Sequence, residues 1–218
     1  MGNTYEPTLE HFTKESESAS MEVLLDNGLY RHLRVRFKNG GFGWFDIMTW
    51  PGNLTITGDC ETFTFSRLED MFAFFRTSSQ RINPGYWQEK VVDGRDRCRE
   101  FDWDLFEKAA LKYFDQRLEG HREWEIVAEA REVLIEALGS ADQDAYGAVE
   151  LIRNFGFDVQ TGGERVFAFR FDDPDSSLDG MTWDYHYIWC CRAIAWAINK
   201  YDEHHAAAPT TDATTHPA

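Results

Sequence analysis

The chain has 218 residues, of which 43% are hydrophobic and 15% aromatic, so it can bury a substantial core. Its formal net charge of −16 at pH 7 argues against binding to nucleic acid, where lysines and arginines must neutralise phosphates, and against binding to anionic membranes. An acidic surface instead suits a basic protein partner, because complementary fields accelerate encounter. The alternative is that the charge serves solubility alone.

The cysteine pattern and the hydropathy indicate a cytoplasmic protein. Cys60, Cys98, Cys190 and Cys191 have no metal-ligand spacing, so we expect reduced thiols and no resident metal. No apolar run approaches the roughly 20 residues that span a bilayer. Residues 1–20 are too polar for a signal peptide and predict a flexible or loosely docked arm. No catalytic motif is recognised, and we expect no cofactor.

The segment from residue 21 to residue 76 predicts an antiparallel sheet followed by a helix. Strands at 21–25 and 29–37 flank the turn formed by Asp26, Asn27 and Gly28. Three more strands, at 44–49, 54–57 and 62–65, complete a meander of about five strands. Ser66 and Glu69 then form a capping box, which predicts a helix that runs to about residue 76.

The rest of the chain predicts a loop and then a helix-rich part. Residues 77–100 are the longest candidate loop and the best place for a domain boundary. Three helices follow, over about 104–118, 122–138 and 140–154, then a strand at 166–171, an acidic loop at 172–180 and a deeply packed helix from about 185 to 201. We expect a disordered tail from residue 204 onward.

Together these elements predict an α+β fold, with an N-terminal antiparallel sheet packed on helices and a C-terminal helical part. Residues 21–203 are predicted to form a single domain, sheet-rich over 21–76 and helix-rich over 101–203.

One predicted helix carries an acidic stripe. Glu125, Glu129, Glu132 and Glu136 are spaced by 4, 3 and 4 positions, opposite a predicted core stripe of Ile126, Ala130, Val133, Leu134 and Ala137. The stripe is either a docking face for a basic partner or a solvated face whose repulsion is tolerated.

A second candidate site is a basic and aromatic row on one strand. Tyr30, His32, Arg34 and Arg36 share one strand face, where they could bind a carboxylate or phosphate. The alternative is pairing across strands with the protein's own acids, for example Asp46 or Glu22.

Three further residues complete this alternative ligand pocket. Asp59 and Arg67 lie where strands end and a helix begins, and Trp50 has no evident structural role. The plain interpretation makes Asp59 a turn residue and Ser66 a cap.

The run around Cys190 leaves three interpretations open. His186 and Cys190 are four residues apart and could share a helix face, with Cys60 or His32 as further zinc ligands. Asp184, His186 and Cys190 could form an acid, base and thiol set. Packing in the core is the third interpretation.

Several short motifs resemble a family of bacteriophage and prophage proteins that usually have no assigned function. The matching pattern is Trp-Phe-Asp, Thr-Trp-Pro-Gly, Gly-Asp, Phe-Ser-Arg and Asp-Met-Phe, at residues 44–46, 49–52, 58–59, 65–67 and 70–72. The resemblance covers about residues 20–78 and 183–202. It implies the product of a phage or prophage in the cytoplasm of a bacterial host, and such accessory proteins are commonly acidic inhibitors of host machinery.

The leading functional hypothesis is therefore an acidic protein that binds a host or phage protein non-covalently, with a host nuclease or defence factor among its candidate targets. The alternative is a small-molecule-binding module or an enzyme for a phosphorylated or carboxylated ligand. A structural or virion-associated role is a third hypothesis, and the sequence leaves the oligomeric state open.

Overall fold

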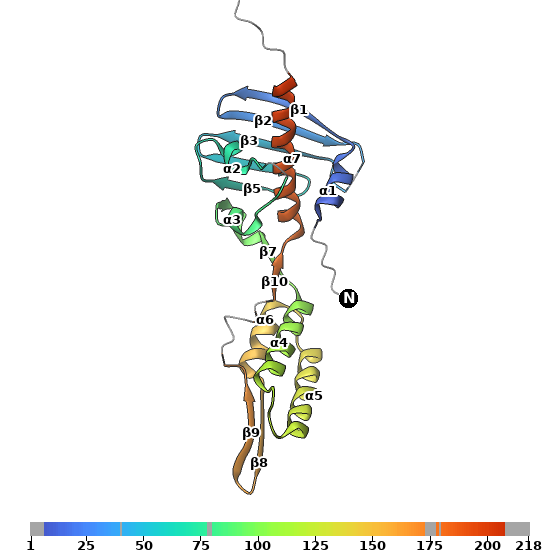
Figure 1. Ribbon diagram of the computed structural model, residues 1–218, viewed down its shortest axis with the longest axis vertical. Coiled ribbons are helices and arrows are strands. Elements are labelled where there is room, and N and C mark those ends of the chain that lie inside the picture. Colours follow the sequence, from blue (N-terminus) through green and yellow to red (C-terminus); the bar gives the residue numbers. More distant parts are fainter. Residues whose placement is uncertain (1–6, 40, 78–79, 173–177, 179, 208–218) are drawn as a thin grey trace, which may run out of the picture. The chain divides into compact units, whose positions relative to one another are not determined.

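The computed structural model describes residues 7–39, 41–77, 80–172, 178 and 180–207, which form two compact units (Figure 1). We call residues 5–98 and 183–218 the sheet unit, and residues 99–182 the inserted unit. The boundary at residues 98 and 99 falls inside the loop predicted at 77–100. Whether residues 21–203 behave as a single domain stays a prediction.

The fold is α+β, as predicted, and the sheet unit is built on a six-stranded antiparallel sheet in the order β1-β2-β3-β4-β5-β6. Its strands are β1 (Ala19–Asn27), β2 (Tyr30–Phe37), β3 (Trp44–Trp50), β4 (Asn53–Gly58), β5 (Phe63–Ser66) and β6 (Val91–Asp93). The sequence predicted the first five. The sixth was missed because it has three residues and lies within a segment rich in charges and turn residues.

Glycines make the two tight turns that fix the first hairpins. Gly28 has a φ of 64° between β1 and β2, and Gly52 has a φ of 81° between β3 and β4. This left-handed backbone favours glycine because it has no Cβ. Strand pairing then places Leu33 opposite Ile47 on the inner face and Arg34 opposite Asp46 on the outer face.

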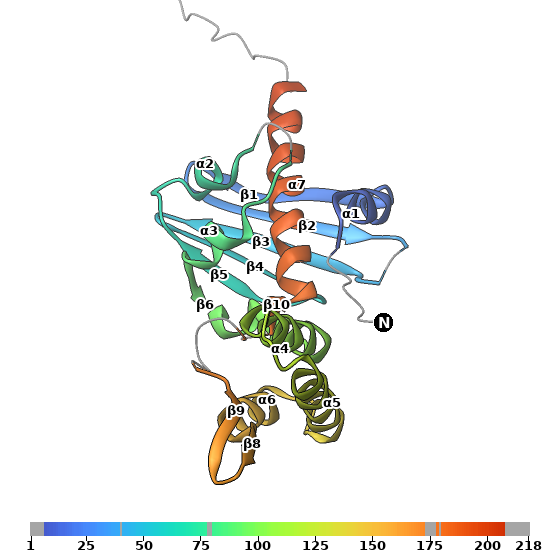
Figure 2. The same cartoon turned by 60° about the horizontal axis from the view of Figure 1, so that its bottom comes forward.

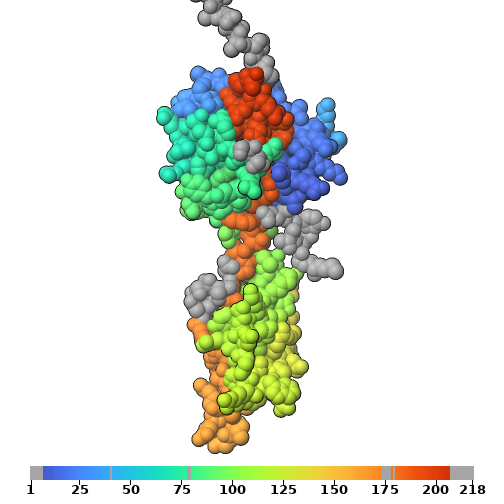
Figure 3. Space-filling view, in the orientation of Figure 1, coloured from blue at the N-terminus to red at the C-terminus, as the bar shows by residue number. Residues whose placement is uncertain are grey.

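The helices of the sheet unit cover one face of the sheet (Figure 1). They are α1 (Leu9–Ser16), α2 (Met71–Phe75), α3 (Pro84–Gln88) and α7 (Tyr185–Ala207), and a 3-10 turn, η1, spans Arg95–Arg97. The space-filling view shows α7 in red between the blue N-terminal segment and the turquoise segment that contains α2 (Figure 3). Helix α7 includes residues 204–207, which moves the predicted start of the tail, and residues 208–218 lie outside the described residues.

The N-terminal arm is a correction to the sequence prediction. Residues 9–16 form a helix, and the side chain of Phe12 is fully buried with its ring 5.3 Å from that of Trp189 on α7. Thr8 caps this helix by accepting a hydrogen bond from the backbone N–H of His11. Two hydrogen bonds from α7 add to this contact: Trp189 Nε1 donates to the carboxylate of Glu15, and Arg192 Nε donates to the carbonyl of Pro7.

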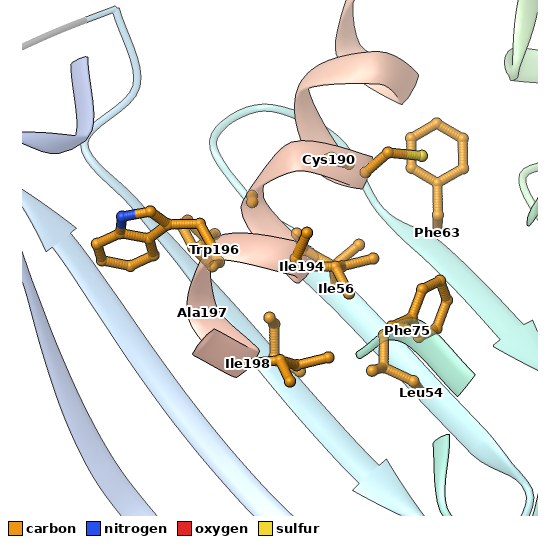
Figure 4. Close-up of a cluster of buried hydrophobic side chains, with 14 of the residues drawn as sticks. Leu54, Ile56, Phe63, Phe75, Cys190, Ile194, Trp196, Ala197 and Ile198 are labelled. Carbon is orange, nitrogen blue, oxygen red and sulfur yellow. The ribbon is translucent and has the colours of Figure 1, made fainter. Parts of the chain in front are cut away.

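Helix α7 closes the core of the sheet unit. Ile194 and Ile198 face Leu54 and Ile56 of β4, and Phe75 of α2 lies beside them (Figure 4). All five side chains are fully buried. Burial of this kind stabilises by about 1.5–3 kcal/mol per large apolar side chain, so the last helix holds the N-terminal sheet together.

The start of α2 is a second correction. Asp70 caps it by accepting a hydrogen bond from the backbone N–H of Phe72, whereas the Ser66 hydroxyl donates to the carbonyl of Gly52. The predicted capping box of Ser66 and Glu69 is therefore wrong. The helix begins at Met71 and has only five residues.

The inserted unit packs helices on a hairpin (Figure 2). Its elements are β7 (Arg99–Phe101), α4 (Trp103–Arg117), α5 (Trp124–Ser140), α6 (Ala145–Asn154), β8 (Gly156–Thr161), β9 (Glu164–Arg170) and β10 (Met181–Trp183). The three helices lie close to their predicted positions, and Asp102 and Asp144 are the N-caps of α4 and α6. The sequence did not predict β8, and residues 173–177 and 179 of the predicted acidic loop lie outside the described residues.

Candidate functional site

The four glutamates of the predicted stripe share the exposed face of α5. Glu125, Glu129, Glu132 and Glu136 are all exposed, whereas Ala130, Leu134 and Leu138 on the opposite side are buried in the core of the inserted unit. Within the part of the chain that the structure describes, none of the four has an ion-pair partner. The face is therefore a row of solvated, uncompensated negative charges.

An apolar row runs beside the glutamates. Trp124 is 70% exposed and Ile135 is 41% exposed, and the exposed Ala128 lies between them at helical spacing. The sequence analysis missed this row, although Trp124 and Ile135 fall outside the predicted core stripe. The predicted core stripe is wrong at Val133, which is 38% exposed. Leu138, which the stripe left out, is buried. We call Glu125, Glu129, Glu132, Glu136, Trp124, Ala128 and Ile135 the α5 face.

The basic row on β2 is occupied by an acid of the protein itself. Arg34 donates two hydrogen bonds to Asp46, from Nε at 2.9 Å and from Nη2 at 2.7 Å, and His32 Nε2 lies 2.8 Å from Asp46 Oδ2. Burial alone would raise the pKa of Asp46, but the hydrogen bonds from Arg34 and His32 outweigh it and lower that pKa. Pairing across strands, the alternative interpretation, accounts for these two basic residues.

The other residues of the alternative ligand pocket do not converge. Tyr30, Trp50 and Arg67 lie at one end of the sheet, where the backbone N–H of Arg67 donates to the carbonyl of Gly52. Arg36 and Asp59 lie at the other end, where both neighbour Trp44. The Asp59 carboxylate accepts a hydrogen bond from the backbone N–H of Gly43 at 2.8 Å, as a turn residue does. Trp50 is 40% exposed.

The residues around Cys190 divide between core and surface. Cys190 is buried beside Phe63 (Figure 4), and burial raises its pKa well above the ordinary value of a thiol. His186 is exposed, and Asp184 accepts a hydrogen bond from the backbone N–H of Tyr187 in the first turn of α7. Core packing therefore describes Cys190 best, because a nucleophilic thiol needs a lowered pKa. Among the described residues, no group of three His, Cys, Asp or Glu side chains could hold a metal ion.

A charged cluster that the sequence analysis missed lies at one end of α7. Arg31 binds Asp70 through both terminal nitrogens, at 2.8 and 3.3 Å, and its guanidinium lies 4.6 Å from the ring centre of Phe72. The Tyr201 hydroxyl donates to Asp26 at 2.9 Å. An arginine at an inward-facing position between Tyr30 and His32 was the available signal. Because its charges are paired, the cluster links β2, α2 and α7 rather than forming a ligand site.

Comparison with known proteins adds no functional information. No protein-family model, no curated protein and no solved structure matches the chain. Over the described residues, no helix combines the length and the apolar character that crossing a membrane requires. The α5 face is therefore the strongest candidate site.

Proposed function

We propose that this protein is a non-enzymatic binding protein that docks a basic and partly apolar protein surface on the α5 face. The observation that carries the proposal is the row of four exposed glutamates without ion-pair partners among the described residues, next to the exposed Trp124. Carboxylates steer a basic partner during encounter, and a tryptophan supplies buried apolar area once contact is made. Binding of this kind requires no catalytic group.

The motifs shared with phage and prophage proteins suggest where the partner is found. On that resemblance, we propose a cytoplasmic protein of a bacterial host, or a protein of the phage itself, as the partner. A host nuclease or defence factor is a candidate because proteins of both kinds can present basic surfaces for nucleic acid. Masking such a surface would inhibit the partner without covalent chemistry.

Affinity capture from a bacterial lysate tests the proposal. The full chain should enrich a basic protein at low salt and release it as salt rises, because exposed charges are screened. Glu129→Lys with Glu132→Lys should abolish capture. Glu17→Lys with Glu69→Lys is the matched control, since it makes the same change in net charge on the sheet unit and should retain capture. Equal loss in both variants, or no enriched protein at low salt, would contradict the proposal.

The alternative of a small-molecule site on β2 has weaker support. Two of its basic residues, His32 and Arg34, already bind Asp46. Asp59 and Arg67 lie at opposite ends of β5. This alternative stays a prediction.

A further inference from the structure

A cavity between α5 and α6 has features that the partner-binding proposal does not use. Its volume is about 410 Å³, within the range of small-ligand sites. The last turn of α5, the following loop and one side of α6 form its walls. It lies within the inserted unit, so one compact unit supplies every wall.

The floor of the cavity is apolar. Leu151 and Phe155, on α6 and at its end, are 8% and 9% exposed, and Ala137 of α5 adds a methyl group. An apolar floor gains free energy only when it is covered by an apolar part of a ligand. An inorganic ion has no apolar part, so it would leave this apolar surface exposed to water.

The rim of the cavity is negative. Asp142 and Glu150 line it, and no lysine, arginine or histidine does. Neither carboxylate has an ion-pair partner within the ranges that the structure describes. The cavity also receives the carboxyl end of α5 at Ser140, where the helix dipole is negative. Three sources of negative potential therefore meet above an apolar floor.

A close backbone approach packs the loop that carries Asp142 against α6, the helix that carries Glu150. A Cβ on Gly147 would lie 2.0 Å from the carbonyl oxygen of Asp142, so only glycine lets α6 pack this tightly against the loop. Glu150 follows Gly147 by one helical turn and lines the same cavity. Backbone packing therefore shapes the cavity, and the side chains of Asp142 and Glu150 that line it are exposed.

We propose that the α5–α6 cavity binds an organic cation, a guanidinium or ammonium group carried on an apolar body. The cation lies between Asp142 and Glu150, and its apolar body covers Leu151 and Phe155. Such a group can come from a free amine or from an arginine or lysine side chain of another protein. The inference does not depend on the α5 face, whose glutamates lie outside this cavity.

Nuclear magnetic resonance titration of the full chain tests this inference. Agmatine carries both cationic groups on a four-carbon chain, and hexane-1,6-diol is its neutral comparator. Agmatine should move the amide signals of Gly147, Leu151 and Asn154 in a saturable way, and the diol should not. N-acetylarginine amide identifies the source, since a site for a protein side chain binds it at least as tightly as agmatine, whereas a site for free amines binds it more weakly.

Paired variants separate the cavity from general acidity. Asp142→Asn with Glu150→Gln should weaken agmatine binding roughly tenfold, because charge-assisted hydrogen bonds are lost. Glu129→Gln with Glu132→Gln removes the same charge outside the cavity and should change binding roughly twofold or less. Non-saturable shifts, equal shifts with the diol, or equal loss in both variants would overturn the inference. The wild-type titrations decide it even if a variant fails to fold.

Discussion

The two units of this protein differ in where they place their charges. The inserted unit, residues 99–182, holds 20 of the 38 acidic residues but only nine of the 22 basic residues, so it carries most of the net charge of −16. In the sheet unit, the buried or partly buried acids Asp46 and Asp70 are paired with Arg34 and Arg31. The sheet unit therefore uses paired charges to hold its structure, whereas the inserted unit presents most of the excess negative charge to solvent.

Core truncations should have the largest effects and test whether the units are independent. Ile194→Ala in the sheet unit and Leu134→Ala in the inserted unit each remove a fully buried side chain. Each should cost about 2–5 kcal/mol, from lost burial and the cavity left behind. Because the two cores are separate clusters, each substitution should shift only the unfolding transition of its own unit.

Urea unfolding followed by tryptophan fluorescence and circular dichroism measures this effect. Six of the eight tryptophans belong to the sheet unit, so fluorescence reports mainly on that unit. The far-ultraviolet circular dichroism of α4, α5 and α6 reports on the inserted unit. A single unfolding transition that both substitutions shift equally would show that the two units unfold together. That result would favour one domain over residues 21–203.

The paired carboxylates of the sheet unit should make its stability depend on pH. The pKa values of Asp46 and Asp70 are lowered in the folded state, so their contribution is present above the unfolded value of about 4 and is lost on acidification. Asp46→Asn should lower the free energy of unfolding at neutral pH. In this variant the free energy of unfolding should also decrease less between about pH 5 and pH 2 than it does in the wild type. Denaturation at a series of pH values measures both effects.

Asp115→Asn is the matched control in the inserted unit. Asp115 pairs with Arg131 at 2.9 Å, but both side chains are substantially exposed. Such surface pairs contribute about 0–1 kcal/mol. An equal effect of the two substitutions would remove the proposed difference in how the units use charge.

Two glycines of the inserted unit should respond in opposite directions to alanine. Gly147→Ala forces a Cβ against the Asp142 carbonyl and should cost about 1–3 kcal/mol. Gly139 lies inside α5 with nothing within 4 Å of an added Cβ, so Gly139→Ala should stabilise by about 0.5–1 kcal/mol. Chemical unfolding of the two variants measures both, and a neutral Gly147→Ala would show that α6 does not need this close approach.

Neutralising the α5 face should give the smallest change in stability. Glu129→Gln removes repulsion with Glu125 and Glu132 and should stabilise the inserted unit by about 0.2–0.5 kcal/mol at low salt. The gain should vanish at high salt because exposed charges are screened. A loss of stability would mean that Glu129 has a structural partner, and thermal unfolding at two salt concentrations decides this.

Most of the fold could be predicted from the sequence because local signals agreed with packing. Alternation along β2 and the turn at Gly28 located the first strands, and helical periodicity located α5 and α7. The three-residue β6 and the helix around Phe12 could not be predicted, because their stability comes from contacts distant in the sequence. Periodicity describes one element at a time and not its neighbours.

The candidate site was only half visible in the sequence. Helical spacing was enough to place the four glutamates on one face. The exposure of Trp124 and the pairing of Arg34 with Asp46 depend on which strands and helices meet, which spacing does not encode. The α5–α6 cavity could not be predicted for the same reason, because it forms where a loop contacts a helix.

Hydrogen–deuterium exchange of the full chain, alone and with the partner captured from lysate, tests the central claim most directly. Binding should slow exchange in peptides that cover residues 124–136 and leave those of β2 and β3 unchanged. Protection confined to β2 and β3 would contradict the account, because it would place the interaction on the outer face of the sheet.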